Sequence, residues 1–176
     1  PAALRRIADM LGPRVVAYAR GQGVEDPDVV ANETLYRVLR DLPAFGGSAA
    51  KLRSWAFTIA HNLIVDDHRR RARRPAISDL AEVVTLAAPV DVEVVVTERS
   101  ELGRTLAAIH ELAPDQRDVL LLRHVADLSL ADTAAVLGKR TNAVKQLQHR
   151  ATKALRRRLA DAAVTPASTS TFTRVP

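Results

Sequence analysis

A run of basic side chains near the end of the chain is the feature best suited to bind a polyanion. Between Lys139 and Arg158 the sequence contains eight Lys or Arg residues, one His and no Asp or Glu. An exposed helix usually mixes acids with its bases, because opposite charges three or four residues apart stabilise it. The absence of acids favours a surface that contacts phosphates over an ordinary solvated face.

The order of side chains along this run favours DNA as the polyanion. At 100° per residue, five apolar residues gather on one side of a helix and predict a packing stripe: Val144, Leu147, Ala151, Leu155 and Leu159. On the other side, amides and an imidazole come first and pure charge follows. A recognition helix meets base edges near its N-terminus and phosphates elsewhere. The candidate DNA-reading residues are Lys139, Arg140, Thr141, Asn142, Lys145, Gln146, His149, Arg150 and Lys153.

Helices are predicted to position these residues, and the fold class is all-α. Ala, Leu and Val dominate the apolar residues and aromatic residues make up only 3%, which favours closely packed helices over a β-sandwich. Apolar spacings of three and four, with stops at Gly and Pro, predict helices over 2–20, 28–42, 51–73, 92–112, 114–125, 129–137 and 141–161. Ser129 is a predicted N-cap. The last two helices, joined around Gly138, have the outline of a helix-turn-helix.

Charge divides the chain into two helical units. Five Arg residues lie within 69–74, and Pro75 follows. The balance then reverses, with six acids and one base over 75–101. We therefore expect a first unit over 1–74, an acidic linker over 75–95, a helix-turn-helix unit over 96–162 and a disordered Ser/Thr/Pro-rich tail over 163–176.

Composition excludes several other classes of protein. The net charge of +6 and pI of about 10.4 favour a nucleic-acid partner. There is no Cys, so disulfides and thiolate metal sites are impossible. The sequence predicts no membrane insertion, no cofactor and no metal, and a cytoplasmic protein. Asp66, Asp67 and His68 suggest a hydrolytic site as a second rival function, but they are consecutive, so on a helix they diverge by 100° per residue and cannot converge without help from elsewhere.

The two units resemble two regions of one known family. The segment LAPDQRDVLLLRHVADLSLADTAAVLGKRTNAVKQLQHRATKALRRRL, which starts at Leu112, is similar to region 4 of bacterial sigma factors, particularly the extracytoplasmic-function group. In the first unit, NETLYRVLRDLPAF and SWAFTIAHNLIVDDHRRR are similar to region 2 of the same family. Two motifs in the right order are much more specific than either alone.

The resemblance implies a subunit that is not an enzyme and that guides core RNA polymerase to promoters. The final helix would read the −35 element. The residues that would face the −10 element are Ser48, Lys51, Arg53, His61, Asn62, Val65, Arg69 and Arg73. Those that would contact core polymerase are Asp28, Asn32, Glu33 and Arg37. The implied partners are core RNA polymerase, promoter DNA and an anti-sigma factor.

Several residues depart from the family pattern. Val29 replaces a second acid after Asp28, and Phe45 and Trp55 lie ten residues apart instead of nine. Trp55 is expected in the core more than against a base. Arg140 stands where a capping Ser is usual, and a cap at Thr141 or Asn142 would move the start of the last helix by one or two residues.

Two alternatives remain open. The acidic linker is interpreted either as a mimic of RNA charge in a polymerase channel or as a solubilising segment. The chain is alternatively a transcription regulator with a C-terminal helix-turn-helix and an N-terminal sensing or dimerisation domain. The regulator hypothesis explains the second unit, but it does not explain the spacing of Trp, Asn and Arg in the segment SWAFTIAHNLIVDDHRRR of the first unit.

Overall fold

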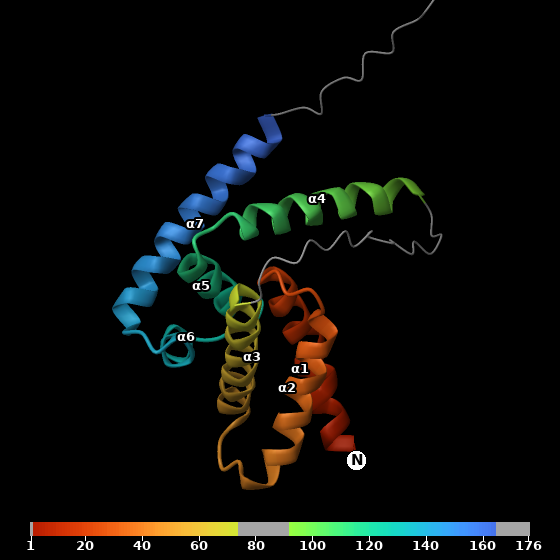
Figure 1. The fold of residues 1–176 in the computed structure, drawn as a ribbon, viewed down its shortest axis with the longest axis vertical. Coiled ribbons are helices and arrows are strands. Elements are labelled where there is room, and N and C mark those ends of the chain that lie inside the picture. Colours follow the sequence, from red (N-terminus) through yellow and green to blue (C-terminus); the bar gives the residue numbers. More distant parts are fainter. Residues whose placement is uncertain (1, 74–91, 165–176) are drawn as a thin grey trace, which may run out of the picture.

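The computed structural model describes residues 2–73 and 92–164, and this part of the chain consists of helices joined by short turns and loops, without a strand (Figure 1). The first unit contains α1 (Ala2–Gly21), α2 (Pro27–Asp41), a short 3-10 turn η1 (Leu42–Ala44) and α3 (Ala49–Arg73). The second contains α4 (Val92–His110), α5 (Pro114–His124), α6 (Leu130–Leu137) and α7 (Thr141–Val164). The predicted all-α class is confirmed. The predicted linker over 75–91 and the tail from 165 lie outside the described residues, whereas 92–95 begin α4 and 163–164 end α7.

The helix ends follow from local side-chain chemistry. The carboxylate of Asp26 accepts a hydrogen bond from the backbone N–H of Val29 at 3.1 Å and caps α2, with Pro27 in the first turn. The hydroxyl of Ser129 accepts one from Asp132 N–H at 3.0 Å, so the predicted cap of α6 is confirmed. Gly138 ends α6 with a φ of 61°, a left-handed conformation that glycine adopts at no steric cost.

The first unit has an apolar cluster of its own, to which each of its three α-helices contributes. Leu11, Val38, Leu52 and Ala56 are buried together there. Trp55 packs against this cluster and stacks on Phe45, with ring centroids 5.1 Å apart and planes 11° from parallel. The expectation that Trp55 belongs to the core is confirmed.

The second unit packs α5, α6 and α7 around two small clusters. Val119, Ala134 and Val144 form one of them, where the turn between α6 and α7 meets α5. In the other, Ala151 lies against Leu112 and Leu120. The predicted apolar stripe of the last helix is therefore confirmed as its packing side.

The two units also share one core, which the sequence analysis did not anticipate. In α5 the four consecutive residues Val119, Leu120, Leu121 and Leu122 are all buried. Four consecutive helical residues point in all directions around the axis, so α5 is apolar on every side and needs neighbours on every side. Val119 and Leu120 face their own unit, and Leu121 and Leu122 join a cluster with residues of α1 and α3: Val15, Tyr18, Ala19, Phe57, Ala60 and Ile64.

No helix in the ranges 2–73 and 92–164 combines the length and apolarity that crossing a bilayer requires.

The shared core predicts a large effect of truncating Leu122, which is fully buried. Leu122→Ala should lower the free energy of unfolding by about 2–5 kcal/mol, because it removes apolar contacts and leaves a cavity. Urea unfolding followed by circular dichroism measures this. Leu102→Ala is the matched control, since Leu102 is 56% exposed on α4 and should change stability by less than about 0.5 kcal/mol. Equal losses in the two variants would contradict the shared core.

Candidate nucleic-acid interface

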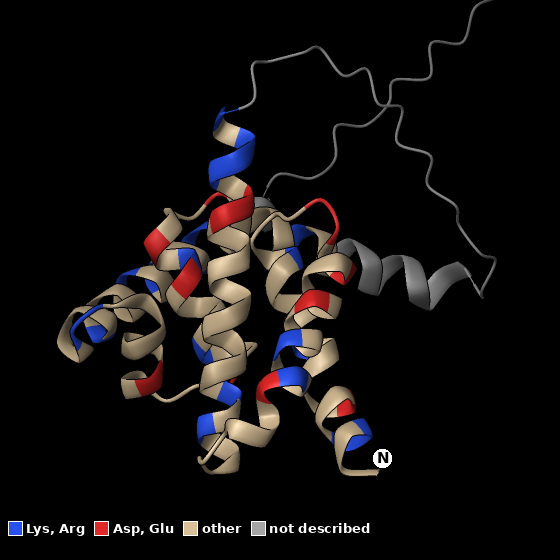
Figure 2. Cartoon of the chain, turned by 60° about the horizontal axis from the view of Figure 1, so that its bottom comes forward, with Lys and Arg blue, Asp and Glu red and all other residues tan. Residues whose placement is uncertain are grey.

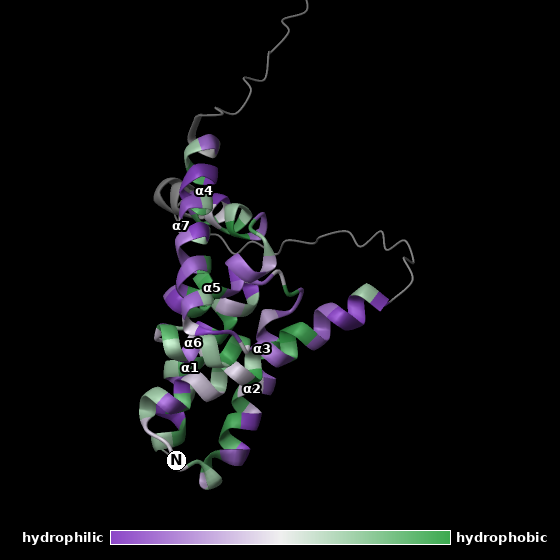
Figure 3. Cartoon of the chain, turned by 90° about the vertical axis from the view of Figure 1, so that its left-hand side faces the viewer, coloured by the Kyte–Doolittle hydropathy of each residue, from purple (hydrophilic) through white to green (hydrophobic). Residues whose placement is uncertain are grey.

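The outer face of α7 presents the predicted reading residues to solvent. Of the nine candidates, all but Lys139 are exposed. Five of them line one shallow concave surface near the start of the helix: Asn142, Lys145, Gln146, His149 and Arg150. Figure 3 shows the strongly hydrophilic character of α7. Polar donors and acceptors thus stand together at the N-terminal half, with the bases of the C-terminal half behind them.

The turn before α7 fixes where this face begins. The N–H of Lys139 donates to the carbonyl of Ala134 at 2.9 Å and that of Gly138 to Ala135 at 3.3 Å, the paired bonds of a Schellman motif. Arg140 is then the only residue between the turn and α7, and its carbonyl accepts from Val144 N–H at 3.1 Å. Arg140 therefore occupies the cap position, and the suggested shift of the helix start to a cap at Thr141 or Asn142 is wrong.

Lys139 differs from the other candidates because it already has a partner. Its Nζ lies 3.0 Å from the Asp115 carboxylate at the start of α5, and its side chain is about one third exposed. This ion pair ties the turn to α5. A phosphate would have to compete with Asp115 for Lys139, whereas the side chain of Arg140 is exposed to solvent.

On α3, most of the predicted −10 residues share one open side. Lys51, Asn62, Val65, Arg69 and Arg73 lie within about 80° of one another on the helix; Val65 is half-buried and the other four are exposed. Basic residues are concentrated in the C-terminal turns of α3, where the described part of the first unit ends (Figure 2).

Ser48 has a structural role at the other end of α3. Its carbonyl accepts from Leu52 N–H at 2.8 Å and its hydroxyl accepts from Lys51 N–H at 3.4 Å. Ser48 therefore stands at the N-cap of α3, in the loop that joins the helix to η1.

Arg53 does not lie on the open side of α3. Two residues after Lys51, it points about 200° around the helix and toward the second unit. Its Nη1 donates to the carbonyl of Asp127 at 3.1 Å and to the Asp127 carboxylate at 2.8 Å. Arg14 of α1 approaches the same carboxylate at 3.8 Å. Asp127 has a φ of 54°, so this acid sits on a tight turn between α5 and α6.

His61 lies next to the contact between the units, and its hydrogen-bond partner belongs to its own unit. Its Nδ1 lies 2.9 Å from the hydroxyl of Tyr18, which is fully buried. Nearby, the side-chain amide of Gln22 donates to the Asp118 carboxylate of α5 at 2.5 Å. Tyr18, Gln22, His61 and Asp118 thus form a polar cluster to which α1, the turn after it, α3 and α5 each contribute one side chain.

Burial dominates the acid–base behaviour of this cluster. Desolvation lowers the pKa of His61, although the nearby Asp118 opposes the shift. Desolvation also raises the pKa of Asp118, opposed by His61 and by the hydrogen bond from Gln22. The pKa of Tyr18 is raised for the same reason. In each case the uncharged form fits the shared core better, because a charge there loses its water.

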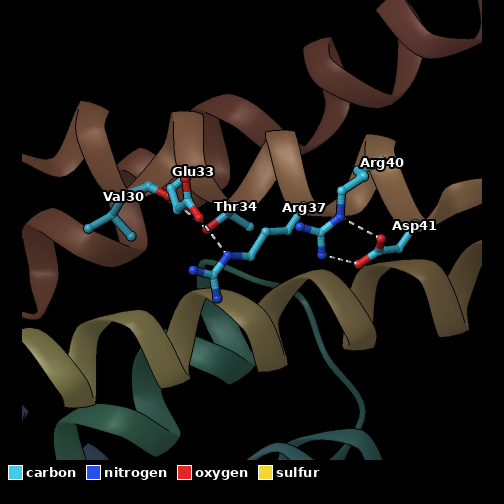
Figure 4. A network of polar contacts seen from close by, with 6 residues as sticks. All are labelled: Val30, Glu33, Thr34, Arg37, Arg40 and Asp41. Carbon is cyan, nitrogen blue, oxygen red and sulfur yellow. Dashed lines mark hydrogen bonds and ion pairs between the residues drawn. The ribbon is translucent and has the colours of Figure 1, made fainter.

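The outer side of α2 is a second polar surface. Asp28 and Asn32 are exposed, whereas Glu33 and Arg37 are half-buried and paired, with Nε and Oε1 2.6 Å apart (Figure 4). One turn further on, Arg40 donates two hydrogen bonds to Asp41, at 2.7 and 2.8 Å.

Sequence reasoning missed two apolar residues on this surface. Val29 is 60% exposed and Tyr36 is 61% exposed. Val29 borders a groove between α2 and the end of α3, whose walls also include Glu33, Arg37 and Arg71. Exposed apolar groups rimmed by charges are typical of surfaces that bind another protein. The sequence did contain a signal for Val29 and Tyr36, because both residues fall on the polar side of the predicted helix and are therefore expected to be exposed.

The geometry does not support a hydrolytic site at 66–68, the second rival function that the sequence suggested. Asp67 pairs with Arg71 of the same helix, with carboxylate and Nε 2.8 Å apart. Within the described ranges, no group of three or more His, Cys, Asp or Glu residues is arranged to hold a metal ion.

Comparison with known proteins places both units in one family. The model of sigma-70 region 2 matches residues 7–74, and that of sigma-70 region 4 matches residues 102–155. An extracytoplasmic-function (ECF) RNA polymerase sigma factor of Streptomyces coelicolor, BldN, is 31% identical over 144 residues, which cover 82% of this chain and 54% of BldN. Another, SigD of Mycobacterium tuberculosis, is 30% identical over 160 residues, 88% of this chain and 76% of SigD.

A solved structure extends the likeness to three dimensions. CnrH, solved in complex with the cytosolic domain of CnrY, has a TM-score of 0.65 and 25% identity, covering 92% of this chain and 89% of CnrH. The chain spans about half the length of BldN and about three quarters of SigD. With matches to both regions in the expected order, the chain belongs to the sigma-70 family, as a member of its ECF type.

Proposed function

We propose that this chain directs core RNA polymerase to specific promoters, with the first unit reading the −10 element and the second the −35 element. The observation that carries the proposal is the acid-free, solvent-exposed face of α7, held on a helix-turn-helix in the same chain as the region 2 unit. The boundaries that fit are 1–74 for the first unit and 96–162 for the second.

The −35 element would be read in the major groove by the start of α7. Lys145 and Gln146 offer donors and an acceptor to base edges from the concave surface that they line with Asn142. Arg150, Lys153 and Arg156 lie further along the exposed side and would contact phosphates. Arg140, at the tight turn, adds a charge where the backbone of the duplex would pass.

The −10 element would contact the open side of α3. Lys51, Asn62, Val65, Arg69 and Arg73 fit this role on exposure and direction. The exposed amide of Asn62 beside Val65 would contact an unstacked base. The two arginines would contact the phosphates of the strand that carries this base. Arg53 would join the set only on release from Asp127 of the second unit, and His61 only on release from Tyr18 of its own unit. Ser48 would act by shaping the loop.

Core polymerase would bind the outer side of α2. The polar candidates Asp28, Asn32, Glu33 and Arg37 are supported there by the exposed Val29 and Tyr36. Aromatic side chains at the centre of a protein interface often contribute most of its affinity. The replacement of an acid by Val29 thus exchanges a charged contact for an apolar one.

The remaining properties follow from the same function. The chain would perform no covalent chemistry of its own and would act in the cytoplasm, where polymerase and promoters are. An anti-sigma factor is the proposed inhibitor, and the capture of CnrH with a cytosolic domain of another protein agrees with such a partner.

Transcription by sigma-free core polymerase tests the function and its alternative. With host genomic DNA as template, the chain should produce transcripts from a small set of shared start sites, whereas core polymerase alone should produce none. A regulator would instead bind a palindromic operator without polymerase. Specific operator binding together with no promoter-specific transcript would reject the sigma function.

The assignment of α7 is tested by substitutions at its two ends. Lys145→Ala or Gln146→Ala should weaken use of the −35 element by about 1–3 kcal/mol if each side chain contacts a base edge. Arg156→Ala should weaken binding with little change in sequence preference and with a shallower salt dependence. Competition between duplexes with intact and altered −35 sequences measures both effects. If Lys145→Ala and Gln146→Ala keep the full preference, the reading face lies elsewhere.

The assignment of α2 is tested at Tyr36. Tyr36→Ala should weaken the affinity for core polymerase by at least tenfold, about 1.4 kcal/mol, without loss of helicity because the side chain is exposed. Leu102→Ala removes a similarly exposed apolar group from α4 and serves as the control. Fluorescence anisotropy of labelled chain titrated with core polymerase gives both affinities. An unchanged affinity for Tyr36→Ala would remove it from the interface.

A further inference from the structure

The ion pair between Lys139 and Asp115 lies beside the start of the reading helix. Lys139 follows Gly138 in the turn between α6 and α7, and α7 begins at Thr141. The Nζ of Lys139 lies 3.0 Å from Oδ2 of Asp115, which is in the first turn of α5. The turn therefore carries two bases, Lys139 and Arg140, of which Lys139 is paired within the chain.

A duplex bound by the start of α7 would bring its backbone to this turn. Asn142, Lys145 and Gln146 line the concave reading surface, and Lys145 lies only about 6 Å along the helix from Thr141, at about 1.5 Å per residue. The groove that a recognition helix enters is bordered by phosphates, so residues next to the start of the helix are common phosphate contacts. Lys139 is thus placed to contact a phosphate once its carboxylate partner no longer holds it.

Asp115 offers Lys139 the same chemistry that a phosphate would offer. A carboxylate, like a phosphate, accepts charge-assisted hydrogen bonds from an ammonium group. The partial positive charge at the start of α5 favours an anion in its first turn, and the cap residue Ala113 makes no side-chain cap hydrogen bond there. The Lys139–Asp115 pair has no net charge, so the turn presents one positive charge, that of the exposed Arg140, instead of two.

One additional phosphate contact has a defined effect on DNA binding. A base that neutralises a phosphate releases counterions, so each contact steepens the slope of log K against log[salt] by about 0.9. In about 0.1 M salt, one contact corresponds to a gain of roughly threefold to tenfold in affinity for any sequence. Such a gain would hold the chain on the roughly 10⁶–10⁹ competing sites that a genome offers.

We propose that Asp115 limits the affinity of the second unit for DNA of any sequence, by holding Lys139 away from the phosphate backbone. The inference rests on the proposed function, because the reading of a duplex by α7 is what brings phosphates to the turn. Asp115 is a positioning residue, since it acts through Lys139 and contacts no DNA itself. The preference between sequences is left to the reading face of α7.

The salt dependence of binding to a duplex without a promoter sequence tests the proposal. The full chain and its Asp115→Asn variant, which keeps the size of the side chain and removes its charge, are titrated onto a short labelled duplex of scrambled sequence. Fluorescence anisotropy gives Kd at several salt concentrations, starting from low salt. Asp115→Asn should bind roughly threefold to tenfold more tightly in about 0.1 M salt, with a slope steeper by about 0.9. An unchanged affinity and slope would overturn the proposal.

Variants of Lys139 separate the holding of this lysine from simple charge repulsion. In a Lys139→Gln background, Asp115→Asn should tighten binding by less than about twofold, because no ammonium is released and the remaining repulsion is screened by salt. An equal gain in both backgrounds would overturn the proposal, since Asp115 would then act by repelling phosphates directly. Asp115→Glu restores a carboxylate near Lys139 and should return the slope to the wild-type value; a slope as steep as that of Asp115→Asn would count against the pair.

Glu111→Gln is the matched control for the change in net charge. Glu111 pairs with Arg158, which lies about 26 Å along α7 from Thr141 at about 1.5 Å per residue. This variant removes one negative charge from the second unit, as Asp115→Asn does, but it should change the slope by much less than the value of about 0.9 for one contact. Equal steepening in the two variants would overturn the proposal, because net charge alone would then explain the effect.

The same titrations distinguish failure of the proposal from failure of the proposed function. With the −35 duplex mapped by the transcription assay, Asp115→Asn should gain the same factor in affinity, so the preference for the −35 sequence should not change. A changed preference would contradict the assignment of Asp115 to backbone binding alone. If the wild-type chain shows no preference for its −35 duplex, the proposed reading of this element fails, whereas a steeper slope in Asp115→Asn would still support the limit that Asp115 sets. A preserved preference with an unchanged slope would reject only the role of Asp115.

Discussion

Burial of α5 on all of its sides is the constraint on which the rest of the structure depends. Val119 and Leu120 complete the core of the helix-turn-helix unit, and Leu121 and Leu122 extend the core of the first unit. An isolated second unit would expose two leucines to water, at a cost of about 1.5–3 kcal/mol for each side chain. The short helix α5 therefore couples the folding of the helix-turn-helix unit to the packing of that unit against the first unit.

The packing of the two units determines which of the predicted DNA-binding residues are accessible. The exposed side of α7 and the open side of α3 are free for DNA, whereas Arg53 and His61 are held by Asp127 and Tyr18. Individual exposed ion pairs contribute little, typically below about 1 kcal/mol, so the apolar contact around α5 must supply most of the stability of the contact between the units.

The sequence was sufficient for what depends on local pattern. Helix positions, the Ser129 cap, the packing side of α7 and the core place of Trp55 follow from spacing and side-chain type. Ion pairs between the units cannot be predicted from local sequence patterns, since Asp127 lies 74 residues from Arg53. One feature of the sequence did point to the shared core. The run Val119–Leu122 is apolar on every side of a helix, so it predicts a helix that is buried all round at this turn. The start of α7 was misjudged because the Schellman bonds after Gly138 leave room only for Arg140 at the cap.

The distance between the two units, measured by pulsed electron spin resonance, tests the central claim most directly. Spin labels on cysteines introduced at Ala17 of α1 and Ala131 of α6, both exposed, are the only labels in a chain without native Cys. The free chain should show one narrow, short distance, because the shared core holds α1 and α6 in one arrangement. A broad distribution that extends to long distances would contradict the account, because the two units would then move independently and share no core.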